Sequence, residues 1–142
     1  MIRLNYKHEC IPNSHTIFVP GINEPKDSNL GITALVCPCD ELFVIKPVQK
    51  RRCDDLFLLP MNLEKLNDYA EKYDYYSYAV CIASYMKEEY DVKGIKVEIK
   101  DNTVPDEYGL KSEAMSLLVV KGFNLIYNLG LTESEEKEIA NY

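Results

Sequence analysis

The sequence predicts an α+β fold in which helices cover a mostly antiparallel sheet. Three observations predict it. Short β-branched and aromatic runs, separated by turn residues, fill the first part of the chain. Apolar residues recur at helical spacing from Asn62 onward. An alternating run then precedes a long apolar segment, so strands come first and helix, strand and helix follow.

The composition predicts one globular domain spanning residues 1–142. The chain has 142 residues, of which 46% are hydrophobic and 27% are charged. These values are ordinary for a domain with a single core. No internal repeat, linker or low-complexity segment divides the sequence.

Four strands are expected in the first part of the chain. Residues 16–19 form a short run closed by Pro20 and Gly21, and a polar loop follows over 23–29. Residues 32–39 and 42–48 are two further runs joined near Asp40, and the simplest interpretation is a hairpin. Residues 56–59 offer a short fourth strand.

Two helices are expected next. Leu63, Leu66, Tyr69 and Ala70 recur at helical spacing, and a longer helix runs from Tyr75 to near Gly94. The longer helix is rich in tyrosine. We interpret its tyrosine stripe as core and rim packing rather than as a stacking platform for a ligand.

The last third of the chain contains the clearest patterns. Residues 95–99 alternate apolar and charged, which predicts a half-exposed strand. Residues 114–127 are apolar nearly all round, which predicts a central buried helix. Residues 128–130, NLG, are a helix stop, and Thr132 with Glu135 forms a capping box that starts a final helix.

The charge balance argues against a nucleic-acid partner. The formal net charge is -7, and residues 101–142 alone hold eight acids against three lysines. Phosphate-backbone binding requires a basic face. A basic run at Lys50, Arg51 and Arg52 is interpreted as a solvated turn.

The same sequence favours a cytoplasmic protein without a membrane partner. The first residues lack the apolar core of a signal peptide, and no apolar run approaches the roughly 20 residues of a membrane span. Five cysteines at irregular spacing fit a reducing compartment. A zinc site is not favoured, because no second metal-binding knuckle follows the C-x-C pair. The side chains considered for it are His8, Cys10, His15, Cys37, Cys39 and Cys53.

The segment 105–115, PDEYGLKSEAM, lies where many proteins bind a phosphate, between a strand and a buried helix. A phosphate-binding loop requires small residues and free backbone N–H groups. This loop instead carries Asp106, Glu107 and Glu113 around its single glycine, Gly109. The acids argue against an anionic ligand.

The pattern resembles the N-terminal domain of the galactokinase branch of the GHMP small-molecule kinases. The order of elements is similar, and the family loop P-x-G-x-G-L-S-S-S-A stands here as 105–114, PDEYGLKSEA. Residues 129–132, LGLT, are similar to the end of the family's helix. Upstream, 19–21 resembles the family's A-P-G, and 23–31 aligns with its sugar-binding landmark.

The resemblance implies a sugar kinase that uses ATP and Mg²⁺. By position, Glu24 and Asp27 would bind the hydroxyls of a monosaccharide, because carboxylates are strong acceptors. Gly109 and Ser112 would remain from the loop that binds ATP. No residue is assigned as catalytic or as a metal ligand.

The departures from the family imply that this domain lacks kinase activity alone. Glu107 replaces the loop's first glycine, and Lys111 and Glu113 replace two serines. The family's catalytic aspartate and its C-terminal half would lie beyond Tyr142, so a second polypeptide or self-association would complete the site. The alternatives are a non-catalytic scaffold that binds a sugar or a partner, and an unrelated α+β interaction module.

Overall fold

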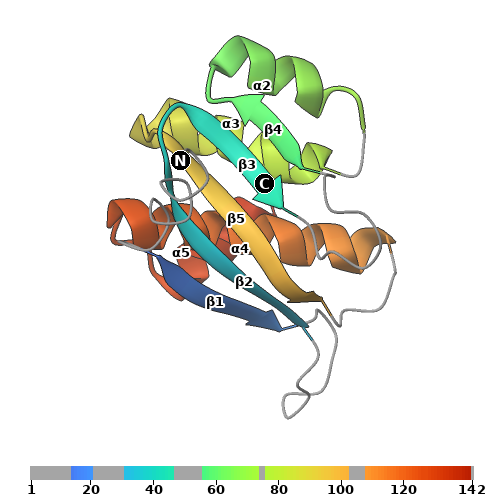
Figure 1. The fold of residues 1–142 in the computed structure, drawn as a ribbon, viewed down its shortest axis with the longest axis vertical. Helices are drawn as coiled ribbons and strands as arrows, with labels where there is room; N and C mark the ends of the chain where they lie inside the picture. The colour runs from blue at the N-terminus through green and yellow to red at the C-terminus, as the bar shows by residue number, and fades with distance from the viewer. Residues whose placement is uncertain (1–13, 21–30, 47–55, 74–75, 103–107, 142) are drawn as a thin grey trace, which may run out of the picture.

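The chain was analysed as a computed structural model that describes residues 14–20, 31–46, 56–73, 76–102 and 108–141. This part of the chain contains a five-stranded sheet and helices, which confirms the predicted α+β class (Figure 1). The elements are β1 (His15–Pro20), β2 (Gly31–Cys39), β3 (Leu42–Lys46), β4 (Phe57–Pro60), α2 (Leu63–Ala70), α3 (Ser77–Tyr90), β5 (Gly94–Asn102), α4 (Tyr108–Tyr127) and α5 (Glu133–Ala140).

The sheet has the strand order β1-β2-β5-β3-β4. Its neighbours are antiparallel except β3 and β5, which run parallel. The expected hairpin between β2 and β3 is therefore wrong, because β5 lies between these two strands. Gly94 permits this arrangement at the start of β5. A side chain there would overlap the backbone carbonyls of Leu42 and Cys39.

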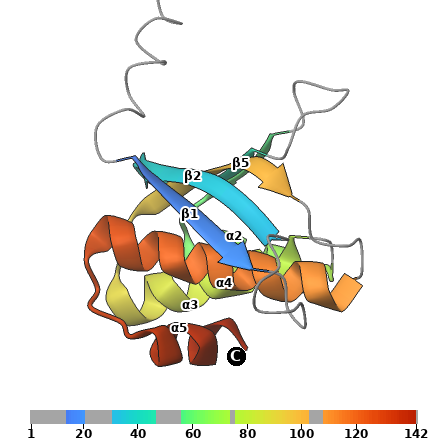
Figure 2. The ribbon, with the colours of Figure 1, turned by 90° about the horizontal axis from the view of Figure 1, so that it is seen from below.

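The described helices α3, α4 and α5 lie on one side of the sheet, with α5 outermost (Figure 2). Alternate residues of β5 supply the inner face of the sheet. Ile95 and Val97 are fully buried, whereas Lys100 on the opposite face is exposed. The predicted alternation is confirmed for Lys100 but not for Lys96, which lies on the same face and is buried. The apolar side of β5 faces α4.

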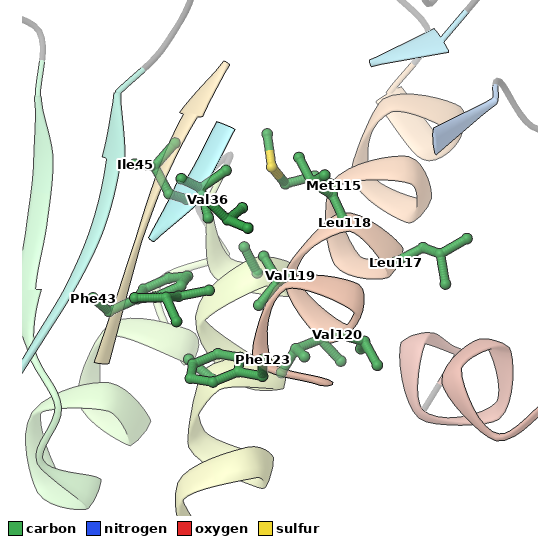
Figure 3. Packing of buried hydrophobic residues seen from close by; sticks show 14 of the residues in the cluster. Val36, Phe43, Ile45, Met115, Leu117, Leu118, Val119, Val120 and Phe123 are labelled. Carbon is green, nitrogen blue, oxygen red and sulfur yellow. The ribbon is translucent and has the colours of Figure 1, made fainter. Parts of the chain in front are cut away.

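Helix α4 is the centre of the core. Its residues 114–120 are all buried, so the prediction of a buried helix is confirmed. Figure 3 shows α4 side chains facing the sheet, where Phe123 stacks on Phe43 at a centroid distance of 6.3 Å. Both rings are fully buried. This ring contact joins α4 to β3.

Helix α4 begins at Tyr108, six residues before the expected Ala114. The expectation was wrong because 109–113 was interpreted as loop from the motif alone. Physically, nothing in that stretch prevents a helix: it contains no proline, and its single glycine costs only about 1 kcal/mol relative to alanine.

Helix α5 is held to α4 by a partly buried polar cluster. Glu136, only 7% exposed, accepts hydrogen bonds from Lys121 Nζ at 2.8 Å and Asn124 Nδ2 at 2.7 Å. Asn124 also bonds both backbone groups of Leu131. The predicted capping box of Thr132 and Glu135 is confirmed. The cluster is a structural tie, since each buried polar group has a partner.

Candidate functional site

Three strand termini lie together at one end of the sheet: the end of β1, the start of β2 and the end of β5. β1 ends at Pro20, which pairs with Gly31 at the start of β2. Ile32 in turn pairs with Asn102 at the end of β5. The amino end of α4 lies on the same side in both views (Figures 1 and 2). We call this region, defined by Pro20, Gly31, Asn102 and the amino end of α4, the loop end of the sheet.

The loop end of the sheet joins the two segments that carry the sequence-predicted residues. Glu24 and Asp27 belong to the connection between β1 and β2, and they lie outside the described residues. Gly109 and Ser112 lie in the first turns of α4, three residues apart and so on one side of the helix. The described strand ends on either side of 21–30 and the first turns of α4 lie at the same end of the sheet.

The amino end of α4 has the general electrostatics of an anion site. The first four N–H groups of a helix lack intrahelical partners, and the aligned peptide dipoles place partial positive charge there. The first turn of α4 contains no acidic residue. The acids of this region, Asp106, Glu107 and Glu113, flank that turn in the sequence.

The structure explains why position 31 is a glycine, which the sequence alone did not reveal. A side chain at this position would overlap the carbonyl of Val19 and press on the ring of Phe18. Glycine therefore lets β1 and β2 close tightly where the predicted sugar-binding segment returns to the sheet. The only sign of this role in the sequence was the position of Gly31 at the end of 23–31, the segment that aligns with the family's sugar-binding landmark.

A charged cluster lies on the face of the sheet turned away from α4. Glu98 is 3.2 Å from Lys100 and 3.5 Å from Lys46. Burial raises the pKa of the Glu98 carboxyl, but the hydrogen bond from Lys100 and the charges of Lys100, Lys46 and Lys96 together lower it below its ordinary value. The carboxyl is therefore ionised at neutral pH, and the cluster is an ion-pair network rather than an acid-base site.

A hollow of about 510 Å³ lies beside the carboxyl end of α4. Its lining includes Tyr127, whose hydroxyl donates to the Gly94 carbonyl at 2.6 Å. Burial, with contributions from Asp40 and Cys39, raises the pKa of Tyr127 to about 12. This phenol keeps its proton at neutral pH and ties α4 to the start of β5.

The side chains considered for zinc are only partly described. Cys37 is buried, Cys39 is half-buried and His15 is exposed, whereas His8, Cys10 and Cys53 lie outside the described residues. Within the described ranges, no three His, Cys, Asp or Glu side chains gather as a metal site would require. None of the described helices is long and apolar enough to span a membrane.

No protein-family model matches this chain, and neither a curated protein nor a solved structure matches it significantly. The functional argument therefore depends on the chemistry of the chain's own residues and on the architecture that anchors them. Of the regions above, the loop end of the sheet combines free helix N–H groups with the predicted ligand-binding segments.

Proposed function

We propose that this chain is a galactokinase-like domain of the GHMP small-molecule kinase class that binds Mg·ATP poorly and has no kinase activity alone. One observation supports it most: the anchors of the predicted sugar-binding and phosphate-binding segments meet at the loop end of the sheet. The order of described elements also agrees with the order on which the resemblance was based.

The proposed loss of ATP binding follows from the negative charge of the loop that precedes and opens α4. Asp106, Glu107 and Glu113 flank, in the sequence, the first turn of α4, where the triphosphate would bind. A carboxylate at ~4 Å from a phosphate charge costs about 4 kcal/mol at an effective dielectric of ~20. Lys111 offsets part of this repulsion but not that of three acids. The Mg²⁺ ion would be bound together with the nucleotide. In the alignment with the family loop, Ser112 is the remaining serine that would help to position the metal.

Titration calorimetry with Mg·ATP tests the proposed loss of nucleotide binding. We expect no saturable binding, or a dissociation constant weaker than about 1 mM, which corresponds to less than about 4 kcal/mol of binding free energy. Micromolar affinity would contradict the proposal and would support an active nucleotide site.

Thermal-shift measurements with a panel of monosaccharides test the retained sugar site. At a sugar concentration of about ten times the dissociation constant, stabilisation of about 1.4 kcal/mol should raise Tm by roughly 5 °C. Glu24→Ala should abolish the shift because it removes a carboxylate acceptor for sugar hydroxyls. Glu138→Ala, at an exposed position of α5, is the matched control and should retain it.

If no sugar shifts Tm, the sugar-binding part of the proposal is wrong and an interaction scaffold remains. That second function would use a second polypeptide or another copy of the chain as its partner. A cytoplasmic location is part of the proposal, because the odd number of cysteines fits a reducing compartment.

A further inference from the structure

A second cavity, separate from the loop end of the sheet, lies between α2 and α3. Its volume is about 570 Å³, which is within the range of small-molecule sites. Its lining mixes aromatic, polar and acidic side chains. They are Asn67, Ala70, Glu71, Tyr73, Ser77, Tyr78 and Cys81.

The cavity is built on two helices that are tied together. Ser84 of α3 donates a hydrogen bond to Asn67 Oδ1 of α2 at 2.6 Å. Ser84 is only 7% exposed, so this bond fixes the spacing of the helices from inside. The cavity is lined by residues of both helices, including Ala70 of α2 and Cys81 of α3, whereas Glu71 and Tyr73 follow the end of α2.

The tyrosines of this region divide into two groups. Tyr69 and Tyr76 pack around Phe57 with centroid distances of 5.0 and 4.6 Å. Tyr73 and Tyr78 do not share that role, because they are 91% and 64% exposed and line the cavity. Of these two, only Tyr78 belongs to the tyrosine stripe identified in the sequence, and it lies at the rim rather than in the core.

Tyr73 also has an unusual backbone. Its φ is 56°, in the left-handed region that a bulky residue adopts at a cost. Glycine would suit the position after a helix end better. A strained and nearly fully exposed tyrosine contributes little to the core.

Among the described residues that line the cavity, Glu71 is the only charged one. Glu71 is the capping residue at the carboxyl end of α2, where the helix dipole adds partial negative charge. Among the described side chains, Glu71 takes part in none of the ion pairs. Its neighbour Lys72 instead lies over the ring of Tyr69, 5.5 Å from its centroid. An anionic ligand is disfavoured here, and a cation is favoured.

We propose that this cavity binds a small organic ammonium ion. The aromatic rings of Tyr73 and Tyr78 supply π electrons that attract a cation, and Glu71 supplies the opposite charge. The side-chain amide of Asn67 can donate a hydrogen bond to a hydroxyl carried by the ligand. This site is independent of the sugar and nucleotide sites proposed above, so either can fail without the other.

Choline is the probe, and its uncharged isostere 3,3-dimethylbutan-1-ol is the matched control ligand. NMR chemical-shift titrations of the full chain should give saturable shifts for choline on residues of α2 and α3. Choline should bind at least about fivefold more tightly than the isostere, since a cation–π contact contributes roughly 1 kcal/mol or more. Equal binding of the two compounds, or no binding of choline, overturns the proposal.

Substitutions at exposed positions measure how much each side chain contributes to choline binding without destabilising the fold. Tyr78→Leu should weaken choline binding at least about threefold, whereas Tyr78→Phe, which keeps the aromatic face, should stay within about twofold. Glu71→Gln should weaken it by a similar factor, about threefold. Tyr90→Leu, at the far end of α3, is the control and should change nothing. An unchanged affinity in Tyr78→Leu and Glu71→Gln overturns the assignment of these residues.

Discussion

Phe123→Ala is expected to lower the free energy of unfolding by about 3–5 kcal/mol, the usual cost of removing a large aromatic side chain from a core. Phe123 is fully buried in α4 and stacks on Phe43 of β3 at 6.3 Å. It also lies 6.3 Å from the ring of Tyr127. The alanine variant leaves a cavity at the junction of α4 with the sheet, which surrounding side chains cannot refill without moving two elements.

Urea denaturation followed by circular dichroism measures this loss. Leu125→Ala is the matched control, because Leu125 is on the same helix and is 44% exposed. We expect it to cost less than about 1 kcal/mol. Similar losses in the two variants would show that α4 does not pack on the sheet as described.

The elements that the sequence predicted well are those with strong local signals. Residues 114–120 are apolar except for Ser116, which indicates burial whatever they pack against. The capping box of Thr132 and Glu135 requires residues only three positions apart, and it formed as expected. The alternation in β5 likewise defines its two faces before any partner strand is known.

The pairing of the strands could not be predicted in the same way. A turn near Asp40 is compatible with a hairpin, but β5 comes from more than fifty residues further along the chain and lies between β2 and β3. The requirement for Gly94 becomes visible only when Leu42 and Cys39 are placed beside it. Contacts between distant segments decide the topology, and composition carries little information about them.

The candidate sites were predictable to different extents. Gly109 and Ser112 were found from a motif, and the structure contributes the helix start at Tyr108 that the motif had hidden. The cavity between α2 and α3 was missed. Its available signal was the tyrosine-rich run that includes Tyr73 and Tyr78, but exposure depends on tertiary packing, so the sequence could not separate ligand-facing rings from core-facing ones.

The other large expected effect is a gain of nucleotide binding when the family loop is restored. The triple variant Glu107→Gly, Lys111→Ser and Glu113→Ser removes two carboxylates and returns the small residues of the family pattern. If the amino end of α4 is the remnant of a phosphate site, its free N–H groups and dipole should then attract the triphosphate. We expect Mg·ATP affinity to rise at least about tenfold, equivalent to 1.4 kcal/mol.

A second triple variant provides the control for net charge. Glu133→Gly, Lys137→Ser and Glu138→Ser changes the same residue types on α5, at exposed positions away from the amino end of α4. It alters the overall charge by the same amount. It should therefore leave Mg·ATP binding unchanged if the effect is local to the loop.

The affinity of the loop-restored variant for Mg·ATP, measured by titration calorimetry beside the original chain and the α5 control, is the most direct test of the galactokinase-like assignment. The assignment predicts saturable binding in the loop-restored variant, at least about tenfold tighter than in the other two proteins. A folded loop-restored variant that binds Mg·ATP no better than the original chain would contradict it.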